Sequence, residues 1–261
     1  MNNTHCISNI EALTAIMSDS LSFLYFGWPY FALVLAFLIV IMILLPPSGP
    51  SELNKIQQRL QNPMTLFCLG GAVYMLHQFE EHGIDFLGNR FAFQAFICKH
   101  FSAMVPTAQT CPASASFILG VNVGSIWISS LIGALLGDKY PLVGAAGSLS
   151  IPAVNFFGHV IPAVTSGRYN PGLLTSILLF APYVSWTYRQ LISRRILTSL
   201  DAIRTIALCG IPVHIVLLYS LILREKGVIN ESQLFWIQIM NGFMPLTLLI
   251  FQKSFKHAHM K

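Results

Sequence analysis

The feature that most constrains the fold is the recurrence of long apolar runs between short polar breaks. Each run is about 20 residues long, which is the length a helix needs to cross the hydrocarbon core of a bilayer. These runs lack the polar stripe that marks a helix of a soluble protein. Only 10% of the residues are charged, against about 25% in an ordinary soluble domain. The sequence therefore predicts an all-α membrane helix bundle that forms a single domain over residues 1–261.

The hydropathy pattern predicts about seven transmembrane helices. A Pro-Pro-Ser-Gly-Pro segment that starts at Pro46 ends the first of them, because proline cannot continue a helix. The apolar residues of segment 89–105 fall on one helical stripe, so this segment is predicted to be a helix lying in the membrane interface and not a further span. The predicted spans are 22–45, 64–83, 116–136, 141–164, 172–191, 203–223 and 234–251.

Lysine and arginine are distributed unevenly between the two ends of the predicted spans. Ten of them belong to loops 46–63, 137–140 and 192–202, the adjoining helix ends and the C-terminal tail, and five lie on the other side. Cytoplasmic loops of membrane proteins are enriched in these residues. We therefore expect a cell-membrane protein with its N-terminus outside and its C-terminus in the cytoplasm. The first 21 residues hold no lysine or arginine, so no signal peptide is expected.

A polar cluster stands at the end of the second predicted span, in the segment HQFEEHGIDF that begins at His77. In a helix, His77, Glu80 and Glu81 share one face because they are three and four residues apart, whereas His82 is predicted to point away from them. A carboxylate at the centre of a bilayer costs about 2.5 to 3.5 kcal/mol on insertion scales, so such groups face a cavity, a partner or an ion.

A second polar set lies far away in the sequence. Asn155 and His159 are four residues apart in the fourth predicted span and therefore share a helical face. The second and fourth spans run in the same direction, so this pair reaches the same outer depth as His77 and Glu80. Asn122 falls in the outer half of the third span. Their common depth predicts a single buried site.

These residues also carry a resemblance. The run His77-Gln-Phe-Glu80-Glu81 matches the signature of the HXXEE domain family of multi-pass membrane proteins. Asn122, the Asn155-x-x-x-His159 pair and the turn Tyr169-Asn-Pro171-Gly172 look like that family's downstream elements. The resemblance covers about residues 60–185 and implies a shared set of polar residues in a membrane bundle. It implies no reaction, since the family has no established activity.

The chemistry of these side chains suggests a metal site. Two histidines and a carboxylate are a common ligand set for catalytic zinc, which leaves one position open for water. We interpret His77, Glu80 and His159 as metal ligands, for zinc in preference to iron. Glu81 would then be the general base, and Asn155 or Asn122 would orient a ligand or polarise a carbonyl. The predicted function is metal-dependent hydrolysis of a lipid or small amphiphile near the outer membrane face.

Two other functions fit the same residues. A transporter or proton-coupled carrier could use the glutamates and histidines as a titrating relay. A structural membrane protein could place the glutamates at a helix end or use them to lock helices together. Nucleic acid is not an expected partner, because no basic stripe with interleaved aromatic residues is present, and neither is a nucleotide or flavin motif. Cys98 and Cys111 fall in one outer loop and could form a disulfide if that side is oxidising.

Overall fold

The computed structural model describes residues 19–45, 52–105 and 111–251. The predicted break at Pro46, the N-terminal segment expected to lack a signal peptide, and the basic C-terminal tail lie outside the described residues. The elements in chain order are α2 Asp19–Leu44, α3 Glu52–Gln61, α4 Pro63–His82, α5 Ala92–Met104, α6 Ala115–Leu119, η1 Gly120–Trp127, α7 Ile128–Leu136, α8 Pro141–Ala145, η2 Ala146–Ser150, α9 Ile151–Ser166, α10 Leu173–Thr175, η3 Ser176–Phe180, α11 Ala181–Ser193, α12 Ser199–Thr205, η4 Ile206–Gly210, α13 Ile211–Glu225, α14 Glu231–Asn241 and η5 Met244–Thr247.

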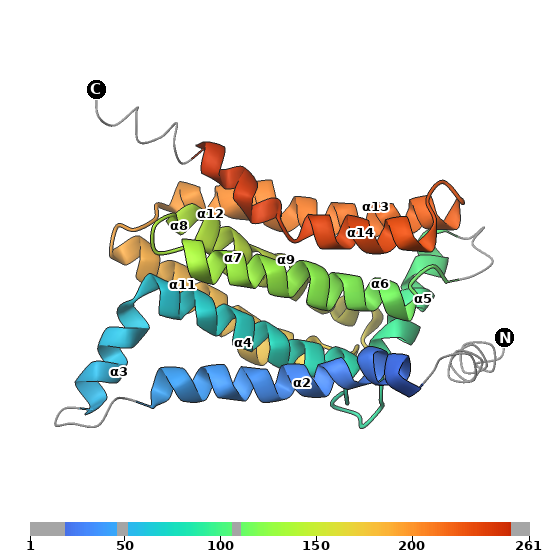
Figure 1. Ribbon diagram of the computed structural model, residues 1–261, viewed down its shortest axis with the longest axis horizontal. Coiled ribbons are helices and arrows are strands. Elements are labelled where there is room, and N and C mark those ends of the chain that lie inside the picture. The colour runs from blue at the N-terminus through green and yellow to red at the C-terminus, as the bar shows by residue number, and fades with distance from the viewer. Residues whose placement is uncertain (1–18, 46–51, 106–110, 252–261) are drawn as a thin grey trace.

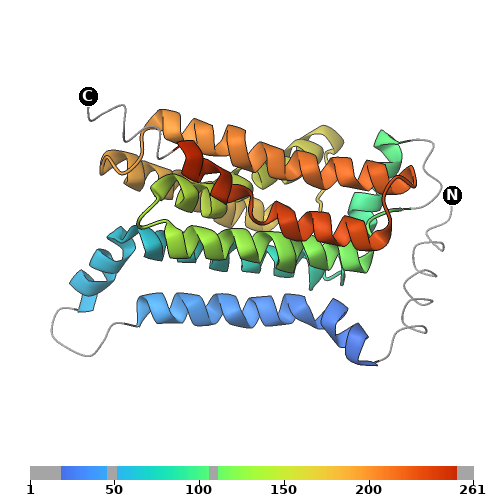
Figure 2. The same cartoon turned by 45° about the horizontal axis from the view of Figure 1, so that its top comes forward.

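The described residues form an all-α bundle, as the sequence predicts, in which long helical segments run side by side in alternating directions (Figures 1 and 2). Each predicted span corresponds to one such segment. By length and hydropathy, however, four segments of the described chain could cross a membrane: Tyr25–Leu44, Ala115–Leu136, Pro141–Ser166 and Ser199–Glu225. The pair Glu231–Asn241 and Met244–Phe251, bent by 49°, would be a fifth.

The predicted count of seven spans is therefore not confirmed. The two segments that fall short are α4 and the run from α10 to α11. Both are helical, but each carries polar side chains within its length: α4 ends in the His/Glu motif, and α11 contains Thr187 and Arg189. Their helical form comes from packing inside the bundle, where α4 lies between α2 and α7 (Figure 1).

Most of segment 89–105 is helical, since α5 spans Ala92–Met104, and α5 lies at the end of the bundle where α4 finishes (Figure 1). It follows a turn in which Asp85 accepts hydrogen bonds from the backbone N–H groups of Leu87 and Asn89. Cys98 and Cys111 form a disulfide, which ties α5 to the segment that precedes α6. The disulfide that the sequence left open is thus present.

The segments η2, η3 and η4 are π-helical turns, which are wider than the turns of an α-helix, and all three have the same cause. Pro152, Pro182 and Pro212 each stand two residues after the end of η2, η3 or η4. Proline lacks a backbone N–H, and its ring crowds the carbonyl four residues earlier. A wider turn moves that carbonyl away and lets the helix continue. The turn at η2 therefore sets the angular position of the residues that follow on α9, including His159.

Glycines bring α4, α7 and the α8–α9 segment into close contact. A Cβ atom on Gly70 would lie 2.8 Å from the carbonyl oxygen of Ser148, and one on Gly147 would lie 2.2 Å from that of Ser129. Small residues at helix contacts let the backbones approach this closely. Around them, Phe67, Leu149 and Phe180 belong to one fully buried apolar cluster. The close packing holds the part of α9 that carries His159 beside the end of α4.

Candidate functional site

The carboxylate of Glu81 lies among three imidazoles. Its Oε1 atom is 3.3 Å from His77 Nε2 and 3.1 Å from His159 Nε2, and its Oε2 atom is 3.5 Å from His82 Nε2. All four side chains are buried. The predicted convergence of α4 and α9 side chains at one depth is therefore present. The expectation that His82 points away is wrong, because its ring, packed between Trp28 and Phe93, turns back to the second oxygen of Glu81.

Local sequence explains why α4 presents these groups together. Asn62 begins the helix by accepting a hydrogen bond from the backbone N–H of Thr65, with Pro63 at the first helical position. Proline is favoured there because its missing N–H has no partner in the first turn. The helix continues without interruption to Gly83. His77 and Glu81, four residues apart, thus lie one above the other on the same face.

A hydrogen-bond chain determines which nitrogen of His77 carries the proton. The hydroxyl of Thr175 donates to Glu80 Oε2 over 2.5 Å, and His77 Nδ1 lies 2.8 Å from the same hydroxyl oxygen. Because that hydroxyl gives its single proton to the carboxylate, it must accept from an N–H at His77 Nδ1. The neutral imidazole then presents a lone pair at Nε2. Asn155 Nδ2 lies 3.0 Å from this Nε2 atom.

His159 is held in the same tautomer by Asn170. The Nδ2 group of Asn170 donates to the backbone carbonyl of His159 over 2.9 Å, which fixes the orientation of the amide. Its Oδ1 atom, 2.8 Å from His159 Nδ1, is therefore an acceptor for the N–H at Nδ1. The Nε2 lone pair of His159 consequently points at Glu81.

Three hydrogen-bond acceptors thus face one another in a buried space. One ligand atom from each of His77, Glu81 and His159 lies within 4.8 Å of the others. Acceptors at such distances repel unless a cation or an additional proton lies between them. The residue types are those of zinc sites, and the partners at both Nδ1 atoms are the kind that orient metal-bound histidines. The group could hold a metal ion.

The carboxylate of Glu80 is turned away from this group. It accepts hydrogen bonds from the Tyr169 hydroxyl at 2.8 Å, from the backbone N–H groups of Leu174 at 3.1 Å and Thr175 at 2.7 Å, and from the Thr175 hydroxyl. Burial raises the pKa of Tyr169, so this phenol stays protonated and keeps donating. The group that could hold a metal ion therefore contains Glu81, whereas the sequence suggested Glu80.

The two asparagines selected from the sequence have different surroundings. Asn155 contacts the cluster directly through His77 and also donates to the Tyr74 hydroxyl at 3.2 Å. Asn122 lies one layer further out: its Oδ1 atom accepts from Gln78 at 3.1 Å, and its Nδ2 group lies 3.1 Å from His82 Nε2. Asn122 therefore positions His82 and does not reach the His77, Glu81 and His159 group.

The turn after α9 contributes more to the site than its sequence alone revealed. Tyr169 and Asn170 bond to Glu80 and His159, and Gly172 covers the cluster. Gly172 has φ 91°, and a Cβ atom there would lie 2.7 Å from Cε1 of both His77 and His159. In the sequence, this turn was recognisable only because it looks like a downstream element of the HXXEE family. Thr175, the partner of His77, carried no sequence signal.

A cavity of about 470 Å³ opens beside the cluster. Its polar lining includes Glu81, His82, Asn155 and His159 beside the cluster, and also His100, Asn122, Ser125, His214 and Asn241. The remaining lining is mostly apolar and includes Phe93, Phe96, Phe117, Ile151, Leu217 and Leu218. An apolar cavity with a few polar groups at one wall is the usual form of a small-molecule site. This space suits a molecule with an apolar chain and a polar group at one end.

The chain was compared with protein families, curated proteins and solved structures, and one family matches the region that contains the cluster. No curated protein and no solved structure matches the chain. Residues 68–187 match the family described as proteins of unknown function with an HXXEE motif. The match spans the motif on α4, the Asn155 and His159 pair and the turn that ends at Gly172, so the resemblance read from the sequence is confirmed. The matched residues 68–187 hold the whole His/Glu cluster, so the chain is similar to the HXXEE family over the region that forms the site.

Proposed function

We propose that this protein is an integral membrane enzyme that hydrolyses a lipid or small amphiphile with the help of a divalent metal ion. The ligands are His77, Glu81 and His159, a set that holds catalytic zinc and also non-haem iron. Zinc is preferred because hydrolysis needs a Lewis acid without redox chemistry. The observation that carries the proposal is the meeting of two Nε2 lone pairs and one carboxylate in a buried space. Bound there, zinc would lower the pKa of a coordinated water.

The surrounding residues support a hydrolytic step. Asn155 lies on the cavity wall next to His77, and if the metal took the Nε2 lone pair of His77, the amide N–H that faces this atom would be free to donate to the oxygen of a substrate carbonyl or phosphoryl group. His82 lies against the second oxygen of Glu81 and also lines the cavity. We assign it the role of accepting a proton from the attacking water. Asn122 would hold this imidazole in place.

The cavity supports the substrate class. Its volume of about 470 Å³ falls in the usual range of ligand pockets, roughly 300–1,000 Å³. Its aromatic and aliphatic lining would take an acyl or alkyl chain, while the polar bond of the same molecule meets Glu81 and His159. We further propose a cell-membrane location with the site toward the outer face, the N-terminus outside and the C-terminus in the cytoplasm, on the distribution of lysine and arginine.

Metal analysis tests this proposal. Purified protein loaded with zinc and then desalted should retain the metal, and His77→Ala and His159→Ala should each lose it. His214→Ala is the matched control, because His214 lines the same cavity but bonds the Gly210 carbonyl through Nδ1. Retention of zinc in both ligand variants at the wild-type level would contradict the site. With the metal bound, esters of increasing chain length then test for hydrolysis.

A proton-coupled carrier is the second candidate, because the same buried carboxylate contacts three imidazoles that could pass protons. It predicts no retained metal and a proton flux across reconstituted vesicles that stops in Glu81→Gln. Metal retention without flux would favour the enzyme. A purely structural role predicts neither result, and both Glu81→Gln and His159→Ala would then affect stability alone.

A further inference from the structure

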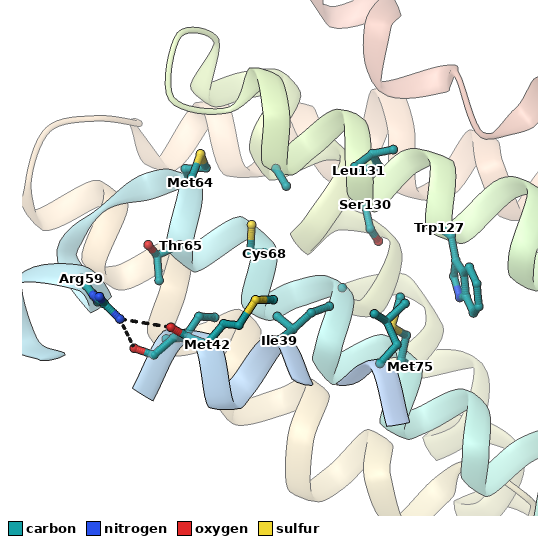
Figure 3. A pocket seen from close by; sticks show the side chains of 14 residues that line it. Ile39, Met42, Arg59, Met64, Thr65, Cys68, Met75, Trp127, Ser130 and Leu131 are labelled. Atoms are coloured by element: carbon teal, nitrogen blue, oxygen red, sulfur yellow. Dashed lines mark hydrogen bonds between the residues drawn. The ribbon is translucent and has the colours of Figure 1, made fainter. Parts of the chain in front are cut away.

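A second cavity of about 550 Å³ shares no lining residue with the first. It lies on the part of α4 that precedes the His/Glu motif, and its lining includes Ile39, Met42, Cys68, Met75, Trp127 and Leu131 (Figure 3). The lining is almost entirely apolar, apart from Arg59, Thr65 and Ser130. Nothing in the proposed hydrolytic mechanism uses these residues.

The packing of three helices creates this groove. Helix α4 forms its floor, since both α2 and α7 pack against α4, whereas α2 and α7 make few direct contacts with each other. Trp127, which stacks on Phe31 with ring centroids 6.1 Å apart, stands at one end. Arg59 on α3 stands at the other end (Figure 3). The result is a long apolar groove with one positive charge at its mouth.

Arg59 is held in place by the end of α2. Its Nη1 atom donates to the backbone carbonyls of Met42 at 3.1 Å, Ile43 at 3.3 Å and Leu45 at 2.9 Å. Within the described residues, the hydrogen bonds of this guanidinium all run from Nη1. A guanidinium carries five N–H donors in a planar fork that suits a phosphate. The Nη2 and Nε groups therefore remain able to bind an anion at the groove mouth.

The side chains around the groove indicate that a molecule bound in it would come from the surrounding membrane. Large apolar side chains are exposed around the groove: Phe37 and Leu38, on the face of α2 outside it, are 55% and 50% accessible, and Leu131 on the α7 wall is 58% accessible. Such surfaces are expected to face hydrocarbon in a membrane bundle. Arg59 belongs to the side of the bundle with more lysine and arginine, which is the cytoplasmic side by the charge rule. Anionic lipids are concentrated in that leaflet and bind basic pockets between transmembrane helices.

We propose that this groove binds an anionic phospholipid of the surrounding bilayer, with one acyl chain between α2 and α7 and the phosphate at Arg59. The long apolar shape selects the chain, and the single charge at its mouth selects an anionic headgroup. The bound lipid would fill the space between α2 and α7. This site is independent of the metal and of the hydrolytic reaction.

The experiment compares phosphatidylglycerol with phosphatidylcholine of identical acyl chains, each added in mixed micelles to the purified full-length protein. Native mass spectrometry counts the retained lipids, and a titration of the thermal midpoint gives the affinity, because a ligand that binds only the folded state stabilises it. Wild-type protein should retain phosphatidylglycerol in preference to phosphatidylcholine. Arg59→Gln should weaken phosphatidylglycerol binding roughly tenfold, the loss expected for charge-assisted hydrogen bonds, and remove the preference.

A second variant covers the case in which Arg59→Gln loosens the end of α2. Leu35→Trp places a large side chain in the groove itself and should abolish retention of both lipids. Its matched control is Leu38→Trp on the exposed face of α2, and Arg189→Gln is the charge control on the same side of the bundle. Both controls should bind as wild type. Equal retention of the two lipids by wild-type protein, or unchanged binding in Leu35→Trp, would overturn the proposal, whereas zinc retention is unaffected by either result.

Discussion

Glu81 Oε1 on α4 and His159 Nε2 on α9 lie 3.1 Å apart, and a neutral His159 imidazole has no proton on the nitrogen that faces the carboxylate. Asn170 keeps the imidazole proton on Nδ1, while Glu81 is a carboxylate in a buried position. Thr175 likewise keeps the proton of the neutral His77 imidazole on Nδ1, so the Nε2 lone pair of His77 faces the same carboxylate. A positive charge between these atoms would relieve their repulsion, so metal binding should depend on the carboxylate of Glu81.

Glu81→Gln and Glu80→Gln should have different effects on metal binding. Glu81→Gln removes the ligand charge, so zinc retained after desalting should fall to background. Glu80→Gln leaves the three ligands intact but disturbs the contacts of Glu80 with Tyr169, Leu174 and Thr175, including the Thr175 hydroxyl that orients His77, which should weaken zinc binding about 10–100-fold. Competition with a chelator of known affinity measures both. Full loss in Glu80→Gln together with wild-type binding in Glu81→Gln would restore the assignment suggested by the sequence.

Gly172→Ala should both destabilise the protein and impair the metal site. A left-handed backbone costs a residue with a Cβ atom about 1–2 kcal/mol, and here the new atom would also press on both imidazoles. Gly88→Ala is the control, because Gly88 has φ 82° with no atom within 4 Å of the added Cβ. Thermal denaturation in detergent should show the larger loss for Gly172→Ala, and only this variant should lose zinc. Identical behaviour of the two variants would mean that Gly172 does not close the site.

Loss of the Cys98–Cys111 disulfide should destabilise the fold but preserve zinc binding. The bridge closes a loop with a sequence separation of 13, for which chain entropy predicts about 3 kcal/mol. Helix α5 supplies no metal ligand, so Cys111→Ser should retain zinc while its free energy of unfolding decreases. Cys68→Ala, which removes a cysteine outside the bridge, serves as the control. An unchanged free energy of unfolding in Cys111→Ser would show that α5 is held by packing alone.

The two chain ends should lie on opposite sides of the membrane. The prediction follows from the lysine and arginine distribution and from the alternating directions of the helical segments (Figure 1). Reporter fusions at residue 10 and after Lys261 measure it directly. Both reporters on one side would mean that the number of crossings is even and that α4, or the run from α10 to α11, does not span the bilayer.

Local chemistry along the chain was enough to predict much of this molecule. The long apolar runs indicated helices because a helix of that length satisfies its backbone hydrogen bonds within its own segment, without water. The four-residue spacing of His77 and Glu81, and of Asn155 and His159, placed each pair on one helical face. Segment order then brought both pairs to one depth. These are properties of a single helix or of helix direction, and so they are visible in the sequence.

Tertiary structure decided which groups meet. Glu80 and Glu81 are adjacent and chemically alike, and no local rule separates them. Only the docking of the Tyr169–Thr175 region surrounds Glu80 with donors and leaves Glu81 facing two histidines. His82 likewise turns inward because Trp28 and Phe93 pack around it. Such choices depend on contacts between segments far apart in the chain, and local spacing contains no information about those contacts.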